Sequence, residues 1–458
     1  MKSADTKQKR IMAKNEEINV IGAGLAGCEA AYQAAQRGVK VNLYEMKPKK
    51  FTPAHHNNNF AELVCSNSLR SDELSNAIGV LKAELREMNS LIMEAADNTK
   101  VPAGSALAVD REQFSNYITE RIKNHPNIQV IEKEVDKISK DEITVIATGP
   151  LTSDAMAECI YHEMGLDGLH FFDAAAPIVD FDTIDMNKAF FASRYNKGDA
   201  DYINCPMTEE EYKAFYNALI SAKEADLHDF DKESQKLTVF EGCMPVEVMA
   251  RRGFETLLYG PMKPVGIEHP ITKETYYAVV QLRKENKEGT MYNLVGFQTH
   301  LTFPEQKRVF SLIPGLENAT FLRYGVMHRN TYIDSPKFLN NDYSLKSNQK
   351  IFFAGQMTGV EGYIESASSG FVAGINASRI ARGTETLDFT DQTIIGALSH
   401  FVNNGGFSGN FQPMNANFGI VAPLGYKVKG GKKVRNEEIA KRALLKIQSL
   451  KSEILKWK

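Results

Sequence analysis

Two of the five cysteines stand in surroundings that suit chemistry rather than packing. Cys65 precedes a run of polar residues, and Cys243 follows a glycine and lies close to a proline. Such segments are typical of exposed turns, where a thiol can ionise and attack an electrophile. Arg251 and Arg252 follow Cys243 closely and would stabilise a thiolate if the fold brings them near. The two thiols are candidates for covalent activation of a substrate or for redox relay.

The other cysteines and the histidines give no comparable signal. Cys28 and Cys159 lie in helical patterns and are interpreted as packing residues, and Cys205 lacks reactive neighbours. An odd, low cysteine count argues against a disulfide framework. No CxxC pair or Cys/His cluster has zinc spacing, so no metal site is expected.

A glycine-rich turn near the start of the chain indicates a dinucleotide site. Apolar residues 18–21 favour a strand, an alanine-rich segment up to Gly38 favours a helix, and a second strand ends at Glu45. The turn between the first strand and the helix has GxGxxG spacing and comprises Gly22, Ala23, Gly24, Leu25, Ala26 and Gly27.

Each part of this unit has a physical role in holding a dinucleotide. The first glycine permits a tight turn, the second lets the backbone approach a pyrophosphate, and the third allows close helix–strand packing. The helix N-terminus offers N–H donors and the positive end of its dipole to the phosphates. Glu45 lies 23 residues after Gly22, close to the spacing of the acid that binds a ribose hydroxyl.

Later segments favour FAD over NAD as the resident cofactor. Residues 145–150 predict a strand that ends at a glycine turn containing Gly149. An apolar strand then runs into Gly355 and Gln356, and a helix of small residues follows Tyr363. This second strand, glycine and helix would place N–H groups against the far half of an extended cofactor.

The fold class expected is α/β, a discontinuous Rossmann-like FAD-binding domain with an inserted α+β domain. Acidic helical residues at about 208–235 and strand-like segments 276–282 and 291–297 indicate the insertion. The expected organisation is a polar extension at 1–17, the FAD-binding domain at 18–190 and 336–425, the inserted substrate domain at 191–335, and a basic tail at 426–458.

Composition and charge exclude little beyond membrane insertion. The formal net charge is −3, and the lysine-rich tail fits either a solvated helix face or phosphate contacts. No apolar run is long enough to span a bilayer, and the first fifteen residues do not resemble a signal peptide. We therefore expect a cytoplasmic protein with no membrane association, and no obligate protein partner is evident.

Several motifs resemble one family, the bacterial folate- and FAD-dependent tRNA (uracil-5-)-methyltransferases (TrmFO, formerly Gid). The resemblance is collinear from about residue 18, and only the first fifteen or so residues look like an extension. Ser105 departs from the glycine expected in many members. The motifs lie at 22–31, 65–72, 101–111, 240–245, 249–253, 257–266, 354–376 and 411–419.

The resemblance implies a substrate, two co-substrates and residue roles. The T-loop uridine of tRNA would become 5-methyluridine, with 5,10-methylenetetrahydrofolate as carbon donor and NADPH or NADH as reductant through FAD. Cys243 matches the cysteine proposed to attack uracil C6, and Cys65 the one proposed to help remove the C5 proton. A cationic surface is expected around the cleft, with Arg251, Arg252 and Lys263 as RNA-binding candidates.

Three alternatives remain open from the sequence. The same chemistry could act on a ribosomal RNA uridine, because the catalytic motifs do not separate the two substrates. A related flavoprotein that modifies wobble uridine with a GTPase partner shares the start of the chain, but it is longer and lacks segment 240–245. A thiol–flavin oxidoreductase for a small molecule is the third, although Cys65 and Cys243 do not form a CxxC or CxxxxC pair.

Overall fold

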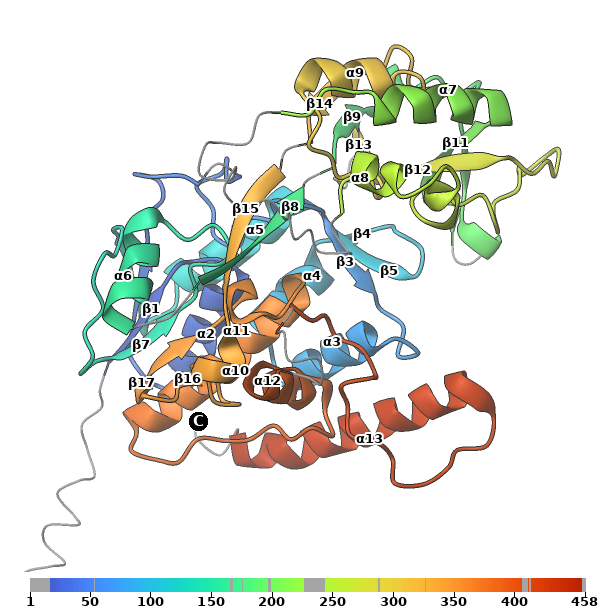
Figure 1. Cartoon of the computed structure of the whole chain (residues 1–458). Helices are drawn as coiled ribbons and strands as arrows, with labels where there is room; N and C mark the ends of the chain where they lie inside the picture. Colours follow the sequence, from blue (N-terminus) through green and yellow to red (C-terminus); the bar gives the residue numbers. More distant parts are fainter. Residues whose placement is uncertain are drawn as a thin grey trace, which may run out of the picture.

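A computed structural model describes residues 17–52, 54–164, 168–174, 176–196, 199–225, 244–286, 289–325, 327–405, 411 and 413–454. Its main body is built on a six-stranded sheet in the order β16-β17-β7-β1-β2-β6 (Figure 1). The five strands from β17 to β6 run parallel, and β16 pairs antiparallel with β17. The strands are β1 (Ile18–Ile21), β2 (Val41–Glu45), β6 (Ile128–Glu132), β7 (Ile143–Ile146), β16 (Ser344–Leu345) and β17 (Asn348–Phe353).

Two helices from distant parts of the sequence pack together in this body. Helix α2 (Leu25–Gln36) follows the glycine turn, and α11 (Tyr363–Ala381) follows the last parallel strand. A Cβ atom on Gly370 would lie 2.1 Å from the carbonyl oxygen of Ala26, so only glycine permits this close approach. The segment that contains α11 therefore packs directly against the segment that contains α2.

Further elements complete the main body around one apolar core. A three-stranded sheet in the order β3-β5-β4 lies beside the helices of the first half. These elements are β3 (Ser68–Ser71), α3 (Ala77–Glu87), α4 (Leu91–Asn98), β4 (Lys100–Val101), β5 (Ala106–Val109), α5 (Arg111–Lys123), α6 (Asp154–Met164), α10 (Ser335–Phe338) and α12 (Ile394–Asn404).

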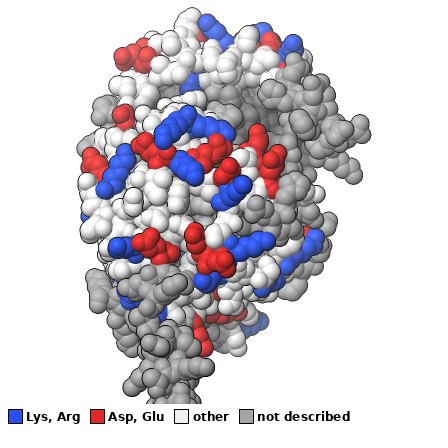
Figure 2. Space-filling model, turned by 90° about the vertical axis from the view of Figure 1, so that its left-hand side faces the viewer, with Lys and Arg blue, Asp and Glu red and all other residues white. Residues whose placement is uncertain are grey.

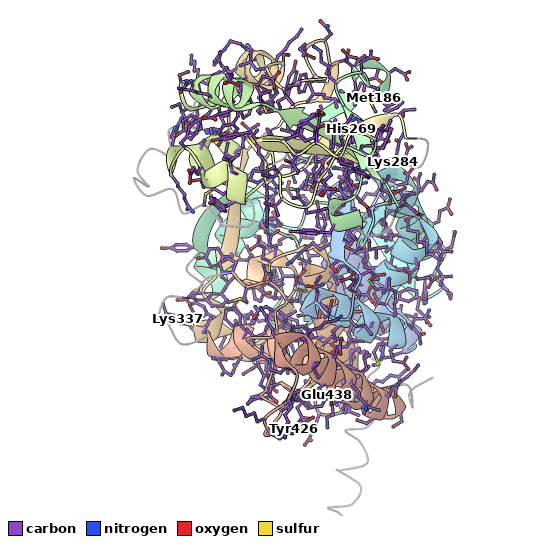
Figure 3. The ribbon with its side chains drawn as sticks, turned by 90° about the vertical axis from the view of Figure 1, so that its right-hand side faces the viewer. Met186, His269, Lys284, Lys337, Tyr426 and Glu438 are labelled. Atoms are coloured by element: carbon purple, nitrogen blue, oxygen red, sulfur yellow. The ribbon has the colours of Figure 1, made fainter. Side chains whose placement is uncertain are left out.

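A second unit carries a six-stranded antiparallel sheet in the order β10-β11-β12-β13-β9-β14. Its helices α7 and α9 pack on the sheet through buried aromatic and aliphatic side chains. Figure 3 shows two residues of this unit, Met186 and His269, at one end of the molecule. The elements are β9 (Ile178–Asp180), β10 (Phe190–Ala192), β11 (Tyr202–Met207), α7 (Glu209–Ile220), α8 (Val246–Arg251), β12 (Ala278–Lys284), β13 (Met291–Leu294), α9 (Phe303–Phe310) and β14 (Phe321–Arg323).

The chain crosses between the two units through a two-stranded antiparallel ribbon. Strand β8 (Gly168–Ala174) leads out of the main body, and β15 (Met327–Ile333) leads back beside it (Figure 1). The antiparallel sheet already includes β9, so the chain enters the second unit before the expected boundary at residue 191. A three-residue strand gives no local pattern by which its sheet could be predicted.

The predicted fold class, α/β with a discontinuous Rossmann-like domain and an inserted α+β unit, is confirmed. The basic tail forms α13 (Gly431–Ile454), which packs on the main body through Ala443 and Ile447. Figure 3 shows Glu438 of this helix at the end of the molecule opposite Met186. Within the described residues, no helix is both long and apolar enough to cross a membrane.

Candidate functional site

A cavity opens at the carboxyl ends of the parallel strands. It holds about 1170 Å³ of space, including its open mouth. Ligands of open α/β sheets bind at this edge, because the loops after parallel strands converge there. Ten predicted cofactor residues line it: Gly22, Ala23, Gly24, Leu25, Ala26, Glu45, Gly149, Gly355, Gln356 and Tyr363.

The three glycines of the fingerprint have different surroundings. A Cβ on Gly27 would lie 1.8 Å from the carbonyl oxygen of Gly22, so this glycine sits under the turn and does not line the cavity. A Cβ on Gly24 would meet no atom within 4 Å, and Gly24 does line the cavity. The open space above Gly24 is what a pyrophosphate needs in order to approach the backbone.

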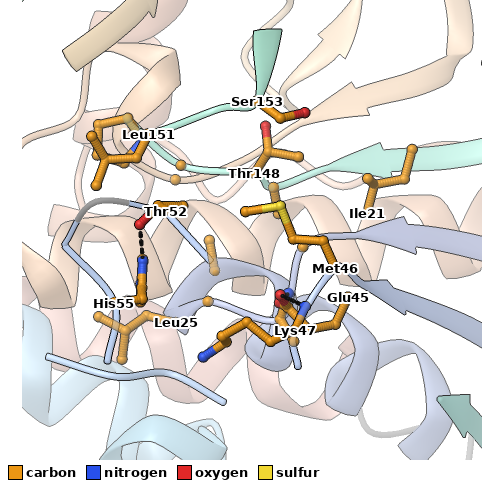
Figure 4. A pocket seen from close by; sticks show the side chains of 18 of the residues that line it. Ile21, Leu25, Glu45, Met46, Lys47, Thr52, His55, Thr148, Leu151 and Ser153 are labelled. Atoms are coloured by element: carbon orange, nitrogen blue, oxygen red, sulfur yellow. Dashed lines mark hydrogen bonds between the residues drawn. The ribbon is translucent and has the colours of Figure 1, made fainter. Parts of the chain in front are cut away.

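Glu45 holds the glycine turn in shape. Its carboxylate accepts hydrogen bonds from the backbone N–H groups of Ala23 at 2.8 Å and Lys47 at 3.0 Å. The side chain is 8% exposed and reaches the cavity wall (Figure 4). A carboxylate has about four acceptor positions. The two bonds to the backbone therefore leave room for a ribose hydroxyl.

The far wall of the cavity comes from the second half of the sequence. Gly355, with φ of +86°, ends the loop after β17, and its N–H donates to the Ser369 hydroxyl at 2.7 Å. Tyr363 and Ser366 reach the cavity from the first turn of α11. Two helix N-termini, those of α2 and α11, thus reach a single cavity, which suits a ligand with several phosphates.

The backbone and side-chain groups of the predicted cofactor site match the chemistry of FAD. The turn offers backbone N–H donors and glycine space for a pyrophosphate, Glu45 offers acceptors for a ribose, and both halves of the sequence line the same cavity. Apolar residues such as Ile21, Leu151 and Met156 supply surface for aromatic rings. We conclude that the residues present match the requirements of FAD.

Cys65 lies beside this cavity, on a loop held by Tyr363. The Tyr363 hydroxyl accepts hydrogen bonds from the N–H groups of Cys65 at 2.8 Å and Ser66 at 3.1 Å. Val64, the preceding residue, lines the cavity, and the Cys65 side chain is partly exposed. Burial raises the pKa of Tyr363, so its hydroxyl stays protonated and keeps its place as a neutral anchor.

Arg111 clamps the same loop to the inserted unit. Its guanidinium donates to the carbonyl oxygens of Leu63 at 2.7 Å and Cys65 at 3.3 Å, and to Glu285 of the inserted unit at 2.6 Å. Burial by itself would lower the pKa of Arg111, but Glu285, Tyr363 and Cys65 together raise it. Arg323, which donates to Val64 at 2.5 Å, adds a second link.

Cys243, the other predicted catalytic cysteine, lies outside the described residues. The chain resumes at Met244, which is buried, and the Val246 N–H donates to the carbonyl oxygen of Gln298 at 2.7 Å. Glu247 accepts from the Thr299 hydroxyl at 2.9 Å, so the start of α8 is firmly anchored. The catalytic role of Cys243 stays a prediction.

The predicted RNA-binding residues all belong to the inserted unit. Arg251 and Arg252 end helix α8 and are exposed, and Arg251 forms an ion pair with Glu224. Lys263 is half-buried, and its carbonyl oxygen accepts a hydrogen bond from Arg194 at 2.9 Å. On the face shown in Figure 2, the cationic and anionic side chains of the described residues are interspersed.

Several residues at the site were not predicted from the sequence. Lys47 lines the cavity and donates to the carbonyl oxygens of Asn57, at 3.1 Å, and Asn59. The Arg111–Glu285 pair joins positions 174 residues apart, which no local pattern reveals. For Lys47, the sequence contains one signal, its position just after a strand end, where parallel sheets place ligand-binding loops.

The chain matches a known protein family and a solved structure. The family model described as "Glucose inhibited division protein A" matches residues 17–385. The structure of Aquifex aeolicus GidA superposes with a TM-score of 0.68 at 18% identity, covering 97% of this chain and 76% of that one. At this identity the superposition supports the fold.

Curated relatives are much closer in sequence. Proteins named methylenetetrahydrofolate--tRNA-(uracil-5-)-methyltransferase TrmFO are 61% identical in Acetivibrio thermocellus and 58% identical in Lactobacillus gasseri. The first alignment covers 93% of this chain and 97% of the relative, and the second covers 96% and 99%. On these grounds the chain belongs to the glucose inhibited division protein A family and, within it, to the TrmFO methyltransferases.

Proposed function

We propose that this protein methylates C5 of the T-loop uridine in tRNA, using FAD, 5,10-methylenetetrahydrofolate and NADPH or NADH. One observation carries the proposal: the loop that bears Cys65 is anchored by Tyr363 to the wall of a cavity that fits FAD. A thiol on that loop would lie close to a cofactor held in the cavity. Its proposed setting is the cytoplasm, where tRNA and reduced nicotinamides are found.

The chain's own residues would divide the work between binding and proton transfer. FAD, when bound, supplies hydride and one-carbon transfer. The glycine turn and Glu45 would hold its adenosine half, and Gly149, Gly355 and Gln356 would contact the remainder from the other parts of the cavity wall. The target uridine must leave its stack to reach this site.

The proposed roles of the cysteines follow from uracil chemistry. Uracil C5 is a poor nucleophile until a thiolate adds at C6 and moves an electron pair onto O4 as an enolate. Cys243 is proposed as that thiolate. Cys65 is proposed to take the C5 proton once the new carbon bond has formed, so that the nitrogen that carried the carbon can leave. A hydride then completes the methyl group, and the resulting enolate expels the Cys243 thiolate. Arg251, Arg252 and Lys263 are proposed to attract the RNA backbone.

The decisive experiment supplies purified protein with unmodified tRNA, isotope-labelled methylenetetrahydrofolate and NADPH. We expect labelled 5-methyluridine at the T-loop position by mass spectrometry, and none without folate or reductant. Cys243→Ala should abolish methylation while FAD remains bound. Labelled product in ribosomal RNA alone would overturn the choice of substrate, and full activity in Cys243→Ala would overturn the nucleophile.

A further inference from the structure

Three aromatic rings in the inserted unit form a stacked row that ends at solvent. Phe321 stacks on Tyr324 with ring centroids 5.4 Å apart and an interplanar angle of 12°. Tyr324 stacks on Phe303 at 4.9 Å and 15°. The Phe303 side chain is 51% exposed, whereas the other two rings are partly buried. We call Phe321, Tyr324 and Phe303 the aromatic row.

Hydrogen bonds hold the aromatic row rigid. Phe303 begins helix α9, and Gln306 on the same helix is fully buried. The Gln306 side chain donates to the carbonyl oxygen of Gly325 at 2.8 Å and accepts from its N–H at 2.7 Å. These bonds fix α9 to the residue after Tyr324. A surface ring held in this way pays little conformational entropy when another ring stacks on it.

Two exposed lysines, Lys307 and Lys223, belong to the segments next to the exposed end of the row. Lys307 lies four residues after Phe303 on α9, so both side chains project from the same helix face. Lys307 is exposed, and no described residue forms an ion pair with it. Lys223 is also exposed, and its carbonyl oxygen accepts the N–H of Thr302 at 3.0 Å.

The aromatic row lies next to Arg323, which contacts the loop that carries Cys65. Arg323, adjacent to Tyr324, donates to the carbonyl oxygen of Val64, which precedes Cys65 and lines the flavin cavity. Burial lowers the pKa of Arg323, and the nearby charge of Arg111 lowers it further. Through Arg323, the chain next to Tyr324 is in direct contact with the loop that forms part of the cavity wall.

We propose that the aromatic row is a stacking platform for a second, unpaired base of the RNA, with Lys307 contacting a phosphate. A single exposed phenylalanine is ordinary on a protein surface. A rigid row that ends in an exposed ring, with Lys307 on the same helix face, instead matches the two chemistries of a nucleotide. The proposal rests on the proposed function, since it assigns a contact to the same RNA substrate.

The test measures binding of the FAD-loaded protein to an unmodified tRNA transcript over a series of salt concentrations. Phe303→Ala should weaken binding roughly 5- to 150-fold, because stacking on an aromatic side chain contributes on the order of 1–3 kcal/mol per base. Phe303→Trp should retain or strengthen binding. Lys307→Ala should reduce the dependence of log affinity on log salt by about one.

Tyr426→Ala is the matched control. Tyr426 is 61% exposed, and Figure 3 shows it at the end of the molecule opposite the inserted unit. Its replacement should leave tRNA affinity and FAD content unchanged. Equal affinities for wild type and Phe303→Ala would overturn the platform while the methyltransferase assignment stands. Failure of the wild type to bind and methylate tRNA would instead overturn the proposed function, and the platform with it.

Discussion

The Tyr363 hydroxyl oxygen lies 2.8 Å from the backbone nitrogen of Cys65, although 298 positions separate the two residues. It accepts this N–H and that of Ser66, so its own proton is directed elsewhere. Tyr363 also lines the cavity that fits FAD. One side chain therefore sets both the cofactor wall and the loop that carries a candidate catalytic thiol.

Replacement of Tyr363 by Phe should reduce methylation while FAD remains bound. The change removes the acceptor of the partly buried N–H groups of Cys65 and Ser66, at a cost of about 1 kcal/mol for each lost hydrogen bond. We expect the loop to shift and the rate of 5-methyluridine formation to fall at least about tenfold. Single-turnover assays with NADPH-reduced enzyme measure this rate. A rate equal to wild type would show that the anchor does not matter.

Gly24→Ala and Gly27→Ala should fail in different ways. A Cβ at position 27 collides with the carbonyl of Gly22, so Gly27→Ala should lower the melting temperature of the protein even without FAD. A Cβ at position 24 meets only open space, so Gly24→Ala should fold normally but bind FAD weakly. Thermal unfolding of the apoprotein and FAD titration separate the two effects. Normal FAD affinity in Gly24→Ala would contradict the proposed pyrophosphate position.

Glu45→Gln should weaken FAD binding by roughly 10- to 100-fold, the equivalent of one hydrogen bond to a charged group. The substituted amide has one acceptor oxygen in place of two, so it cannot hold Ala23, Lys47 and a ribose hydroxyl together. Flavin fluorescence gives the dissociation constant. Glu134→Gln is the control, since Glu134 lines the same cavity but bonds to Lys50. Similar effects of both substitutions would show that FAD affinity depends on the negative charge of the cavity wall and not on the hydrogen bonds of Glu45.

Lys82 should make stability depend on pH. Its side chain is fully buried, and its ammonium donates to the carbonyl oxygens of Arg70 at 3.1 Å and Ser71 at 2.6 Å. Burial lowers the pKa of Lys82 to about 8. Between this value and the unfolded value of 10.5 the unfolded chain binds more protons, so this group's contribution to stability rises with pH.

The Lys82→Met variant lacks that titration. The melting temperature of wild type relative to Lys82→Met should therefore increase from pH 8 to pH 10 and stay level below pH 7. Scanning calorimetry of both proteins at each pH measures the difference. A difference that is constant across this range would show that the Lys82 ammonium is not perturbed by folding.

The sequence by itself determined the cofactor class and much of the local structure. Glycine spacing and alternating apolar runs act over a few residues, so the turn at Gly22, helix α2 and strand β17 could all be predicted. The family resemblance carried the substrate and the roles of Cys65 and Cys243, because it compares whole motifs in order. Comparisons with known proteins confirmed the family.

Tertiary structure decided which distant residues meet. The bond between Tyr363 and Cys65, the Arg111–Glu285 pair and the aromatic row that ends at Phe303 each join segments without a shared local pattern. Strand β9 joins the second sheet for the same reason. Such contacts depend on how sheets and helices pack, and packing is set by the whole chain rather than by spacing within any one segment.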